Sequence, residues 1–358
     1  MEGSQQLMCG VAGGIWTTGG TPLPDNVLRQ MTSVLEHRGP DGEGQHCEQL
    51  PDGSGVALGH RRLSIIDLAG GAQPMANEDE SVWVTFNGEI YNYRELRSEL
   101  KAAGHHFRTD SDTETLVHLY EQKGIDMLHD LRGMFAFAIW DRKRNRLLLA
   151  RDRMGQKPLV YRAEKGRLLF ASEIKSLLQV PGVPRSLDPV ALDQYLTYLY
   201  VPHPRTMFSG INKLPPAHYG IYENGKLEIA SYWSPEWNTK SVLSAAEMQE
   251  QLEAELAESI RLRLRSDVPL GAFLSGGIDS TVIVGLMQQG MAQPARTYTI
   301  GFPVDSYDES GAARLIADHL KTDHQQIEVR PDCLEVLPAL TWHFDEPFGD
   351  SSSIPTYY

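Results

Sequence analysis

The most restrictive feature of this 358-residue sequence is a run of alternating strand-like and helical segments after about residue 240. An order of strand, helix, strand, helix and strand predicts a parallel sheet with right-handed crossovers. The predicted strands are residues 268–274, 296–300 and 325–329, and the predicted helices are residues 279–289 and 309–320. Ligands of such sheets bind at the carboxyl ends of the strands, which places an expected site just after residue 274.

The loop at that position reads Leu274-Ser-Gly-Gly-Ile-Asp-Ser280. Its two glycines permit a tight turn close to an anion, and the amides that open the next helix can bind phosphate. Ser275 and Ser280 add hydroxyl donors, and Asp279 can help to hold Mg²⁺. The loop lacks the lysine of a Walker A motif and does not match the G-x-S-x-G pattern of a nucleophile elbow. A plain glycine-rich turn is the alternative, which the strand–loop–helix setting disfavours.

A capped, amphipathic helix is predicted immediately before this sheet. Ser244 and Glu247 form a capping box. One apolar stripe follows at every fourth residue, made of Met248, Leu252, Leu256, Ile260 and Leu264. Residues 180–216 are rich in proline and glycine and are predicted to connect two domains.

The first half of the chain is predicted to be a layered α+β domain, because short strands are grouped with interspersed helices. The predicted strands are residues 81–86, 134–140, 146–150 and 168–171, and the predicted helices are residues 25–37, 93–103 and 112–123.

Composition excludes several classes of protein. The formal net charge of -14 argues against general binding to nucleic acid or to anionic membranes. Three cysteines give no disulfide framework. The sequence shows no secretory signal, and its densest apolar run, residues 134–140, is too short to span a bilayer. A cytoplasmic protein is expected. His60, His105 and His106 lack the spacing of metal ligands and are predicted to be structural.

Cys9 stands at the head of an ordered series of short motifs. A single cysteine is usually a small buried hydrophobe, so its neighbours decide its interpretation. The motifs that follow are His37-Arg-Gly-Pro-Asp41, Gly59–Asp67, Gln73-Pro74, Phe86-Asn-Gly-Glu-Ile-Tyr-Asn92, Asp110-Ser-Asp-Thr-Glu114, Gly133–Ala138, Arg151-Asp152 and Ala171-Ser-Glu-Ile-Lys175. This set closely resembles the glutamine-hydrolysing asparagine synthetase family, over essentially all of residues 8–358. The loop at residues 274–280 resembles the pyrophosphate-binding loop of the ATP-pyrophosphatase superfamily.

The resemblance implies two domains after an N-terminal extension at residues 1–8. Residues 9–216 are expected to form a class II glutamine amidotransferase domain with the N-terminal nucleophile (Ntn) hydrolase fold, an α/β/β/α sandwich. Residues 217–358 are expected to form an α/β parallel-sheet ATP-pyrophosphatase domain that is C-terminally incomplete. The resemblance further implies glutamine, aspartate and ATP as substrates, Mg²⁺, ammonia transfer between the domains and a possible homodimer.

The same resemblance assigns the chemistry of the first domain. Cys9 would attack the glutamine amide, and its own α-amine would be the base, with an ordinary pKa near ~8. The Asn87 side chain and the Gly88 backbone N–H match the oxyanion pair.

Four further residues match the family's glutamine-binding positions. Arg62, with its neighbour Leu63, matches the clamp on the α-carboxylate, which suits a guanidinium. Glu89 and Asp112 match the residues that face the substrate ammonium. A structural ion pair is the alternative for Arg62 and Asp112.

In the second domain the resemblance implies an ATP site. Leu274 and Ile300 match backbone positions that hold adenine, and Asp279 is the candidate for Mg²⁺. The phosphate-binding positions are Ser275, Gly276, Gly277, Asp279 and Ser280. Residues 345–353 resemble the family segment near the nucleotide and the acceptor.

Two features leave alternatives open. The family's cysteine is the first residue after removal of methionine, whereas eight residues precede Cys9, so we expect the active form to begin at Cys9. The glutamine and phosphate motifs would also serve a related amidotransferase that acts on another carboxylate, for instance in envelope polysaccharide biosynthesis. A non-catalytic remnant that binds glutamine or nucleotide is the third possibility.

Overall fold

The computed structural model describes residues 8–303, 308–330, 333–350 and 352–358. These residues form two compact units. The first unit consists of the chain up to Pro235 together with residues 341–350, and the second consists of residues 236–340 and 351–358. The predicted boundary between residues 216 and 217 is therefore too early. Strands β11 (His218–Glu223) and β12 (Lys226–Ser231) are hydrogen-bonded into a sheet of the first unit, so they belong to that unit.

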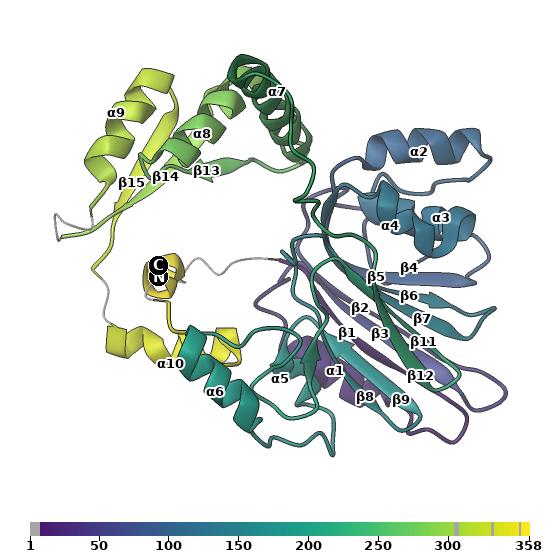
Figure 1. Ribbon diagram of the computed structural model, residues 1–358. Helices are drawn as coiled ribbons and strands as arrows, with labels where there is room; N and C mark the ends of the chain where they lie inside the picture. Colours follow the sequence, from purple (N-terminus) through teal and green to yellow (C-terminus); the bar gives the residue numbers. More distant parts are fainter. Residues whose placement is uncertain (1–7, 304–307, 331–332, 351) are drawn as a thin grey trace. The chain divides into compact units, whose positions relative to one another are not determined.

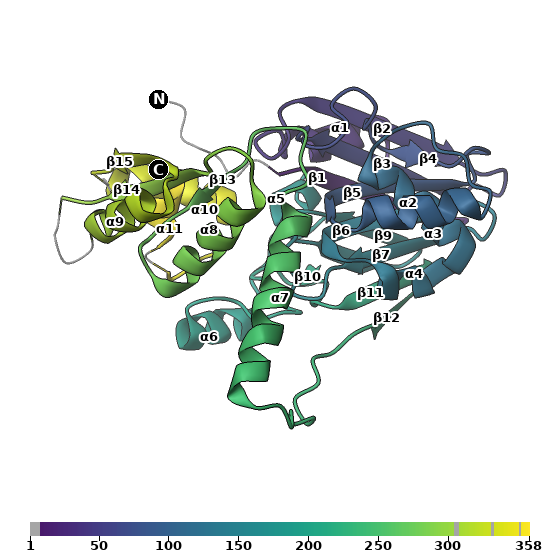
Figure 2. The ribbon, with the colours of Figure 1, turned by 90° about the horizontal axis from the view of Figure 1, so that it is seen from above.

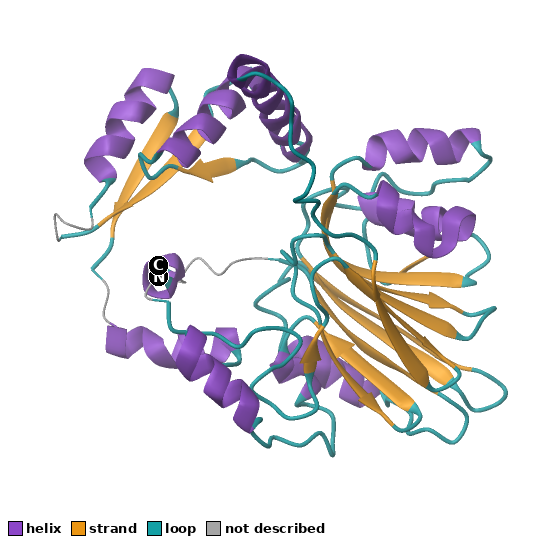
Figure 3. Cartoon of the chain, in the orientation of Figure 1, coloured by secondary structure: helices purple, strands orange, loops and turns teal. Residues whose placement is uncertain are grey.

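Two six-stranded antiparallel sheets form the centre of the first unit (Figures 1 and 3). Sheet A has the strand order β10-β8-β9-β1-β3-β2, and sheet B has the order β12-β11-β7-β6-β5-β4. The remaining strands are β1 (Gly10–Trp16), β2 (Gly42–Gln49), β3 (Gly55–Arg62), β4 (Met75–Ala76), β5 (Val82–Ile90), β6 (Gly133–Asp141), β7 (Arg146–Arg151), β8 (Val160–Glu164), β9 (Arg167–Ala171) and β10 (Asn212–Lys213).

Helices cover the outer faces of both sheets, which gives four layers. One apolar core lies between sheet A and helices α1 and α5, a second lies between the sheets, and a third lies between sheet B and α2, α3 and α4. The helices of this unit are α1 (Asp25–Ser33), α2 (Tyr93–Ala102), α3 (Asp112–Lys123), η1 (Gly124–Asp126), α4 (Met127–Asp130), α5 (Ile174–Leu177) and α6 (Pro189–Tyr198). The α/β/β/α sandwich is thus confirmed.

Strand β6 shows how the sequence builds these layers. Successive side chains of a strand point to opposite faces. Phe135, Phe137 and Ile139 accordingly pack toward the helices on sheet B. Ala136 and Trp140 pack between the sheets. A strand covered on both faces must be apolar throughout, which explains the apolar run at residues 134–140.

Residues 180–216 do not link the two units, contrary to the prediction. They contain α6 and β10, and Val180, Val183 and Ile211 are buried in the core beneath sheet A. Helix α6 is capped by Asp188, whose carboxylate accepts from the backbone N–H groups of Val190 and Ala191. Proline and glycine here shape a packed irregular segment.

The second unit contains the predicted parallel sheet. Strands β13 (Gly271–Phe273), β14 (Arg296–Gly301) and β15 (Asp323–Glu328) lie side by side in that order. Helices α8 (Ile278–Gly290) and α9 (Ser310–Leu320) connect them, and both pack on the same face of the sheet (Figure 1). The predicted strand–helix order is confirmed, although β13 is shorter than expected. The chain ends in α10 (Cys333–Phe344) and α11 (Ser353–Tyr357).

Helix α7 (Ala245–Arg263) begins at the predicted capping box, with Ser244 and Glu247 bonded reciprocally. Its early turns extend beyond α8 in Figure 2. In the predicted apolar stripe, Met248 and Leu252 are 45% and 59% exposed. Leu262, which is not a member of the stripe, is buried near the other end of the helix.

Among the described residues, no helix is both long and apolar enough to cross a bilayer.

Asp152 organises the loop that follows β7. Its side chain is fully buried and accepts hydrogen bonds from four backbone N–H groups, those of Phe135, Met154, Gln156 and Lys157. Bonds to an ionised acceptor are stronger than neutral ones, and orphaned buried donors are costly. This carboxylate therefore fixes residues 152–157 against β6.

We expect Asp152→Ala to lower the free energy of unfolding by about 3 kcal/mol or more, because it leaves buried N–H groups without an acceptor. Urea unfolding followed by tryptophan fluorescence measures the change. Asp193→Ala, at an exposed position on α6, is the matched control and should stay within about 0.5 kcal/mol of the parent. Equal effects of the two substitutions would contradict the role of Asp152.

Candidate active site

Cys9 lies immediately before β1, at the edge of a cavity of about 130 Å³. The backbone N–H of Leu63 donates to its Sγ at 3.3 Å, and Sγ lies 3.6 Å from the Leu63 carbonyl oxygen. The thiol is thereby fixed against the end of β3, beside the cavity.

Arg38 holds the backbone on both sides of this cysteine. Its carbonyl accepts from the N–H of Met8 at 2.7 Å, and its Nε donates to the carbonyl of Cys9 at 3.0 Å. Its guanidinium is itself fixed by Glu173 at 2.7 Å. The motifs at residues 37–41 and 171–175 therefore meet beside Cys9, and Arg38 braces the backbone there.

Cys9 favours its neutral thiol form in this protein. Burial raises the pKa of Cys9 to about 11, and the nearby carboxylates of Glu89 and Asp112 act in the same direction. The Leu63 N–H and the Arg38 charge only partly offset this effect on the pKa. Because the thiolate is the reactive form, a reaction at this thiol would need a base that removes its proton.

Asn87 and Gly88 lie near the end of β5 and line the same cavity. The Asn87 side chain is 1% exposed, and its Nδ2 has no hydrogen-bond partner among the described residues. A buried amide donor without a partner is costly unless a ligand accepts from it. Gly88 is required on steric grounds, since a Cβ there would lie 2.1 Å from the Met134 carbonyl oxygen. Asn87 Nδ2 can therefore donate to an oxygen of a bound molecule.

Two carboxylates contribute negative charge to the cavity. Glu89 lines it from β5, and Asp112 lines it from the first residue of α3. Asp112 accepts from the N–H of Ile90 at 2.9 Å, and burial raises its pKa to about 6 in spite of that bond. A cationic ligand group would be stabilised between these two side chains.

Arg62, the last residue of β3, and Leu63, which follows it, also line the cavity. The Arg62 guanidinium donates to three backbone carbonyls, of Ile66, Asp67 and Leu68, at 3.3, 2.5 and 3.0 Å. These bonds use three of its five N–H groups and leave two. Arg62 therefore holds the loop at residues 66–68 and still offers N–H groups to a ligand.

The cavity also contains residues that the sequence analysis did not name as site residues. Gln73 accepts from the Phe86 N–H at 2.7 Å and so fixes the strand that carries Asn87. Lys157 places its ammonium 3.0 Å from Sδ of Met8. The motifs Gln73-Pro74 and Arg151-Asp152 lie in or next to these segments, but their side-chain directions depend on the packed fold.

The predicted phosphate loop lies between β13 and α8 in the second unit. Ser275 and Ser280 face each other, with their hydroxyl oxygens 3.1 Å apart. Gly277 is the N-cap of α8 and provides no side-chain cap, so the first amides of the helix are not satisfied by capping. Gly276 has φ +83°, and a Cβ there would lie 2.8 Å from Ala312 Cβ in α9. This local arrangement fits an anion.

The remaining predicted ATP residues lie around this loop with different exposure. Leu274 is 1% exposed, and its carbonyl accepts from the Thr299 hydroxyl. Ile300 is partly buried in β14. Asp279 is exposed in the first turn of α8, where a carboxylate can reach a cation.

Residues 345–353 are expected near the nucleotide and the acceptor, but the first two of them contact the first unit. Asp345 pairs with Lys175 at 3.0 Å, and Glu346 pairs with Lys213, both in the first unit. Residue 351 lies outside the described residues. No described contact joins these two carboxylates to the phosphate loop.

His60 is fully buried, and its Nε2 lies 3.0 Å from the Phe86 carbonyl oxygen. Burial lowers the pKa of His60 to about 4, which fits its predicted structural role.

Comparison with known proteins matches both parts of the chain. The model of the glutamine amidotransferase domain family matches residues 8–233, and the model of the asparagine synthase family matches residues 251–358. The chain is 38% identical over 337 residues to asparagine synthetase (glutamine-hydrolyzing) 1 of Bacillus subtilis (strain 168), covering 93% of this chain and 52% of that protein. Asparagine synthetase (glutamine-hydrolyzing) 2 of the same organism is 39% identical over 312 residues, 82% of this chain and 40% of that protein.

A relative with a different name has a similar degree of likeness. Amidase chry2 of Gibberella zeae is 34% identical over 372 residues, which cover 96% of this chain and 54% of that protein. The chain thus spans about half the length of these curated relatives. With both family models matched in order and the cysteine cavity in place, the chain belongs to the glutamine-hydrolysing asparagine synthetase family.

Proposed function

We propose that this chain hydrolyses glutamine at Cys9 and supplies the ammonia to an ATP-dependent amidation of aspartate. The observation that carries the proposal is the cavity in which the Cys9 thiol, Asn87 and two carboxylates meet, with Asn87 Nδ2 lacking a hydrogen-bond partner among the described residues. A thiol, an oxyanion donor and anionic groups for a ligand ammonium are what hydrolysis of an amino-acid amide needs.

In the proposed reaction, Cys9 Sγ attacks the side-chain carbonyl carbon of glutamine. The carbonyl oxygen becomes an oxyanion that accepts from Asn87 Nδ2 and the Gly88 N–H. The thiol proton passes to the leaving nitrogen, which departs as ammonia and leaves a thioester. Water then attacks the thioester, which gives glutamate and restores the thiol.

The base in this scheme is the α-amine of Cys9. An amine with an ordinary pKa near ~8 can accept the thiol proton near neutral pH, whereas an amide nitrogen cannot. In the described chain this nitrogen is bonded to Met8, which itself lines the cavity. The active form is therefore the one that begins at Cys9, with Met8 and the preceding residues removed.

Recognition of glutamine follows from the charges around the cavity. Asp112 and Glu89 would hold the substrate ammonium, and Arg62 would hold the α-carboxylate with the two N–H groups that its bonds to backbone carbonyls leave. Leu63 contributes the backbone N–H that positions the thiol. Substrates without an α-amino or α-carboxylate group would lose these contacts.

The second unit would bind ATP at residues 274–280. The amides at the start of α8 and the Ser275 and Ser280 hydroxyls would hold the phosphates, with Leu274 and Ile300 at the adenine. Mg²⁺ would lie at Asp279 and neutralise phosphate charge. Aspartate is then activated as its adenylate, with loss of pyrophosphate, and ammonia displaces AMP to give asparagine.

An acceptor other than aspartate is the second candidate. The relative named amidase chry2 resembles this chain about as closely as the asparagine synthetases do. Glutamine hydrolysis and adenylation are common to both readings, so only the carboxylate that accepts ammonia differs.

We expect the form that begins at Cys9 to release glutamate from glutamine at least about 100-fold faster than the form that retains Met1–Met8, because general-base assistance contributes ~10²–10⁴ in rate. Translation from Met8 with removal of that methionine gives the short form, and intact mass verifies each N-terminus. Equal rates with the extension attached would exclude the α-amine as base. Cys9→Ala in the short form should abolish glutamate release.

In the form that retains Met8, alkylation of Cys9 by iodoacetamide should rise about tenfold per pH unit from pH 7 to pH 10, because its pKa is raised to about 11 and the thiolate is the reacting form. Peptide mass mapping separates Cys9 from Cys47, whose pKa is raised by burial to about 12. A rate that levels off near pH 8 would contradict the buried thiol.

Asp279→Ala should reduce aspartate-dependent pyrophosphate release from Mg-ATP by about 100-fold or more in the natively expressed protein, with ammonium chloride as the nitrogen source. Glutamate release should be unchanged, because the cysteine cavity lies in the other unit. Asp318→Ala, exposed on α9, is the matched control and should retain pyrophosphate release.

Near-normal pyrophosphate release by Asp279→Ala would exclude the assigned role. Release that depends on a different carboxylate, and not on aspartate, would support the second candidate.

A further inference from the structure

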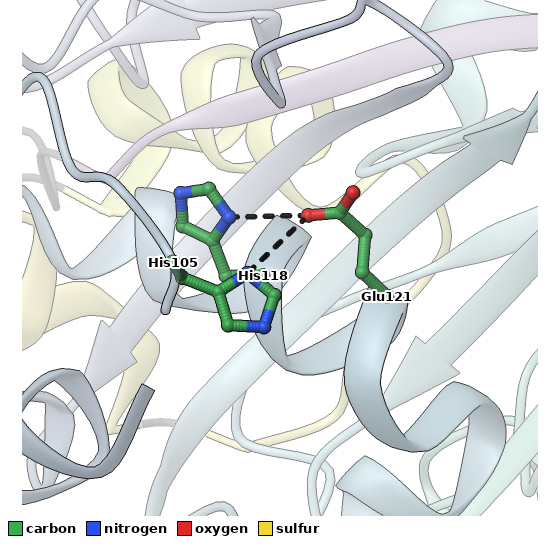
Figure 4. Close-up of side chains that lie close together, drawn as sticks. All are labelled: His105, His118 and Glu121. Carbon is green, nitrogen blue, oxygen red and sulfur yellow. Dashed lines mark hydrogen bonds and ion pairs between the residues drawn. The ribbon is translucent and has the colours of Figure 1, made fainter. Parts of the chain in front are cut away.

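A cluster of nitrogen and oxygen ligands lies outside the cysteine cavity, on the helices that cover sheet B (Figure 4). His105 follows α2, and His118 and Glu121 lie one turn apart on α3. The two imidazole rings and the carboxylate point toward one another, and their ligand atoms all lie within 4.8 Å of each other.

The distances between these atoms fit a four-coordinate metal ion. Oε2 of Glu121 lies 3.1 Å from His118 Nδ1 and 3.8 Å from His105 Nδ1. Ligands at about 2.0–2.2 Å from a tetrahedral Zn²⁺ stand about 3.3–3.6 Å apart, which falls between these values. Small side-chain rotations would therefore complete the arrangement.

The groups behind these side chains resemble the outer shell of a metal site. The His118 side chain is 1% exposed, and its Nε2 has no hydrogen-bond partner among the described residues but lies 3.8 Å from the Glu114 carboxylate. The other oxygen of Glu121, Oε1, accepts from Asn77 at 2.7 Å. Hydrogen bonds to a ligating carboxylate, like the one from Asn77, orient metal ligands in this way.

A fourth protein ligand is within reach. Glu78 Oε2 lies 3.8 Å from His118 Nδ1, and Glu78 Oε1 accepts from the His106 backbone N–H at 3.2 Å. We propose that His105, His118 and Glu121 bind one Zn²⁺ ion, with Glu78 or water in the fourth position. Two imidazoles with carboxylates favour zinc over Mg²⁺ or Ca²⁺, which take oxygen ligands.

The competing arrangement is a protonated His118 held by carboxylates. Burial lowers the pKa of His118, but Glu114 and Glu121 outweigh it and raise the pKa to about 9. The same negative charge attracts a proton or a metal ion, so only a binding measurement distinguishes them.

The position of this site gives it a structural consequence. Helix α3 begins with Asp112, which lines the cysteine cavity, and His118 follows about 9 Å further along the helix. A bound ion would tie α3 to the loop that carries His105. The zinc would act as a brace for the helix that presents Asp112.

The test is zinc binding by the untagged chain after removal of metals with EDTA. When zinc is added to the metal-free chain and the excess is dialysed away, we expect one equivalent to remain, as measured by elemental analysis. Co²⁺ bound in its place should give the visible absorption of a four-coordinate site. His105→Ala should weaken zinc binding at least tenfold. His106→Ala, the neighbouring exposed histidine, is the matched control and should change the affinity less than twofold.

Absence of retained zinc in the parent chain would overturn the proposal, and so would equal losses in the His105 and His106 variants. Cys9→Ala should retain the zinc, whereas loss of zinc in that variant would place the ion at the cysteine cavity and exclude the histidine site.

Discussion

The buried carboxylate of Glu173 is the interaction on which the cysteine cavity depends. It accepts from Arg38 and His37 and pairs with Lys175. Burial alone would raise the pKa of Glu173, but these partners hold it well below its usual range, so the carboxylate stays charged. Through Arg38 it fixes the carbonyl of Cys9. Cys9 is thus positioned by an ion network that holds its backbone, while the Leu63 N–H holds its thiol beside the cavity.

The same network reaches a segment that follows the second unit in the sequence. Lys175 contacts both Glu173 and Asp345, and the Lys175 backbone N–H also donates to Asp345. Residues 341–350 consequently pack with the first unit. An uncompensated charge would be costly at any of these positions, because all three side chains are nearly buried. Chain segments distant in sequence are therefore joined through charge compensation.

The two candidate sites, the cysteine cavity and the loop at residues 274–280, use different kinds of hydrogen-bond donor. In the cysteine cavity, the buried Asn87 Nδ2, which has no hydrogen-bond partner among the described residues, would donate to an oxyanion. The loop at residues 274–280 instead offers main-chain amides at the start of α8, next to Gly276 and Gly277, which could bind phosphate. The cysteine cavity needs the assembled sandwich, because its residues come from distant segments. The loop at residues 274–280 is nearly complete within one strand–loop–helix unit.

Local chemistry explains what the sequence determined by itself. The capping box at Ser244, the βαβαβ order and the extent of α3 follow from hydrogen bonds and periodicity within a few residues, and the structure has them where predicted. Family motifs also identified Cys9, Asn87 and Asp112 as members of one site, and all three line one cavity.

Tertiary structure decided what depends on contacts between distant segments. The first unit extends to Pro235 because β11 and β12 pair with β7 and with each other, and their pairing partners cannot be read from local pattern. Lys157 enters the cavity only because Asp152 folds its loop against β6. His105 and His118, 13 positions apart (118 − 105), meet only because α2 and α3 pack together. Periodicity specifies which face of an element is buried, while packing alone specifies what it meets.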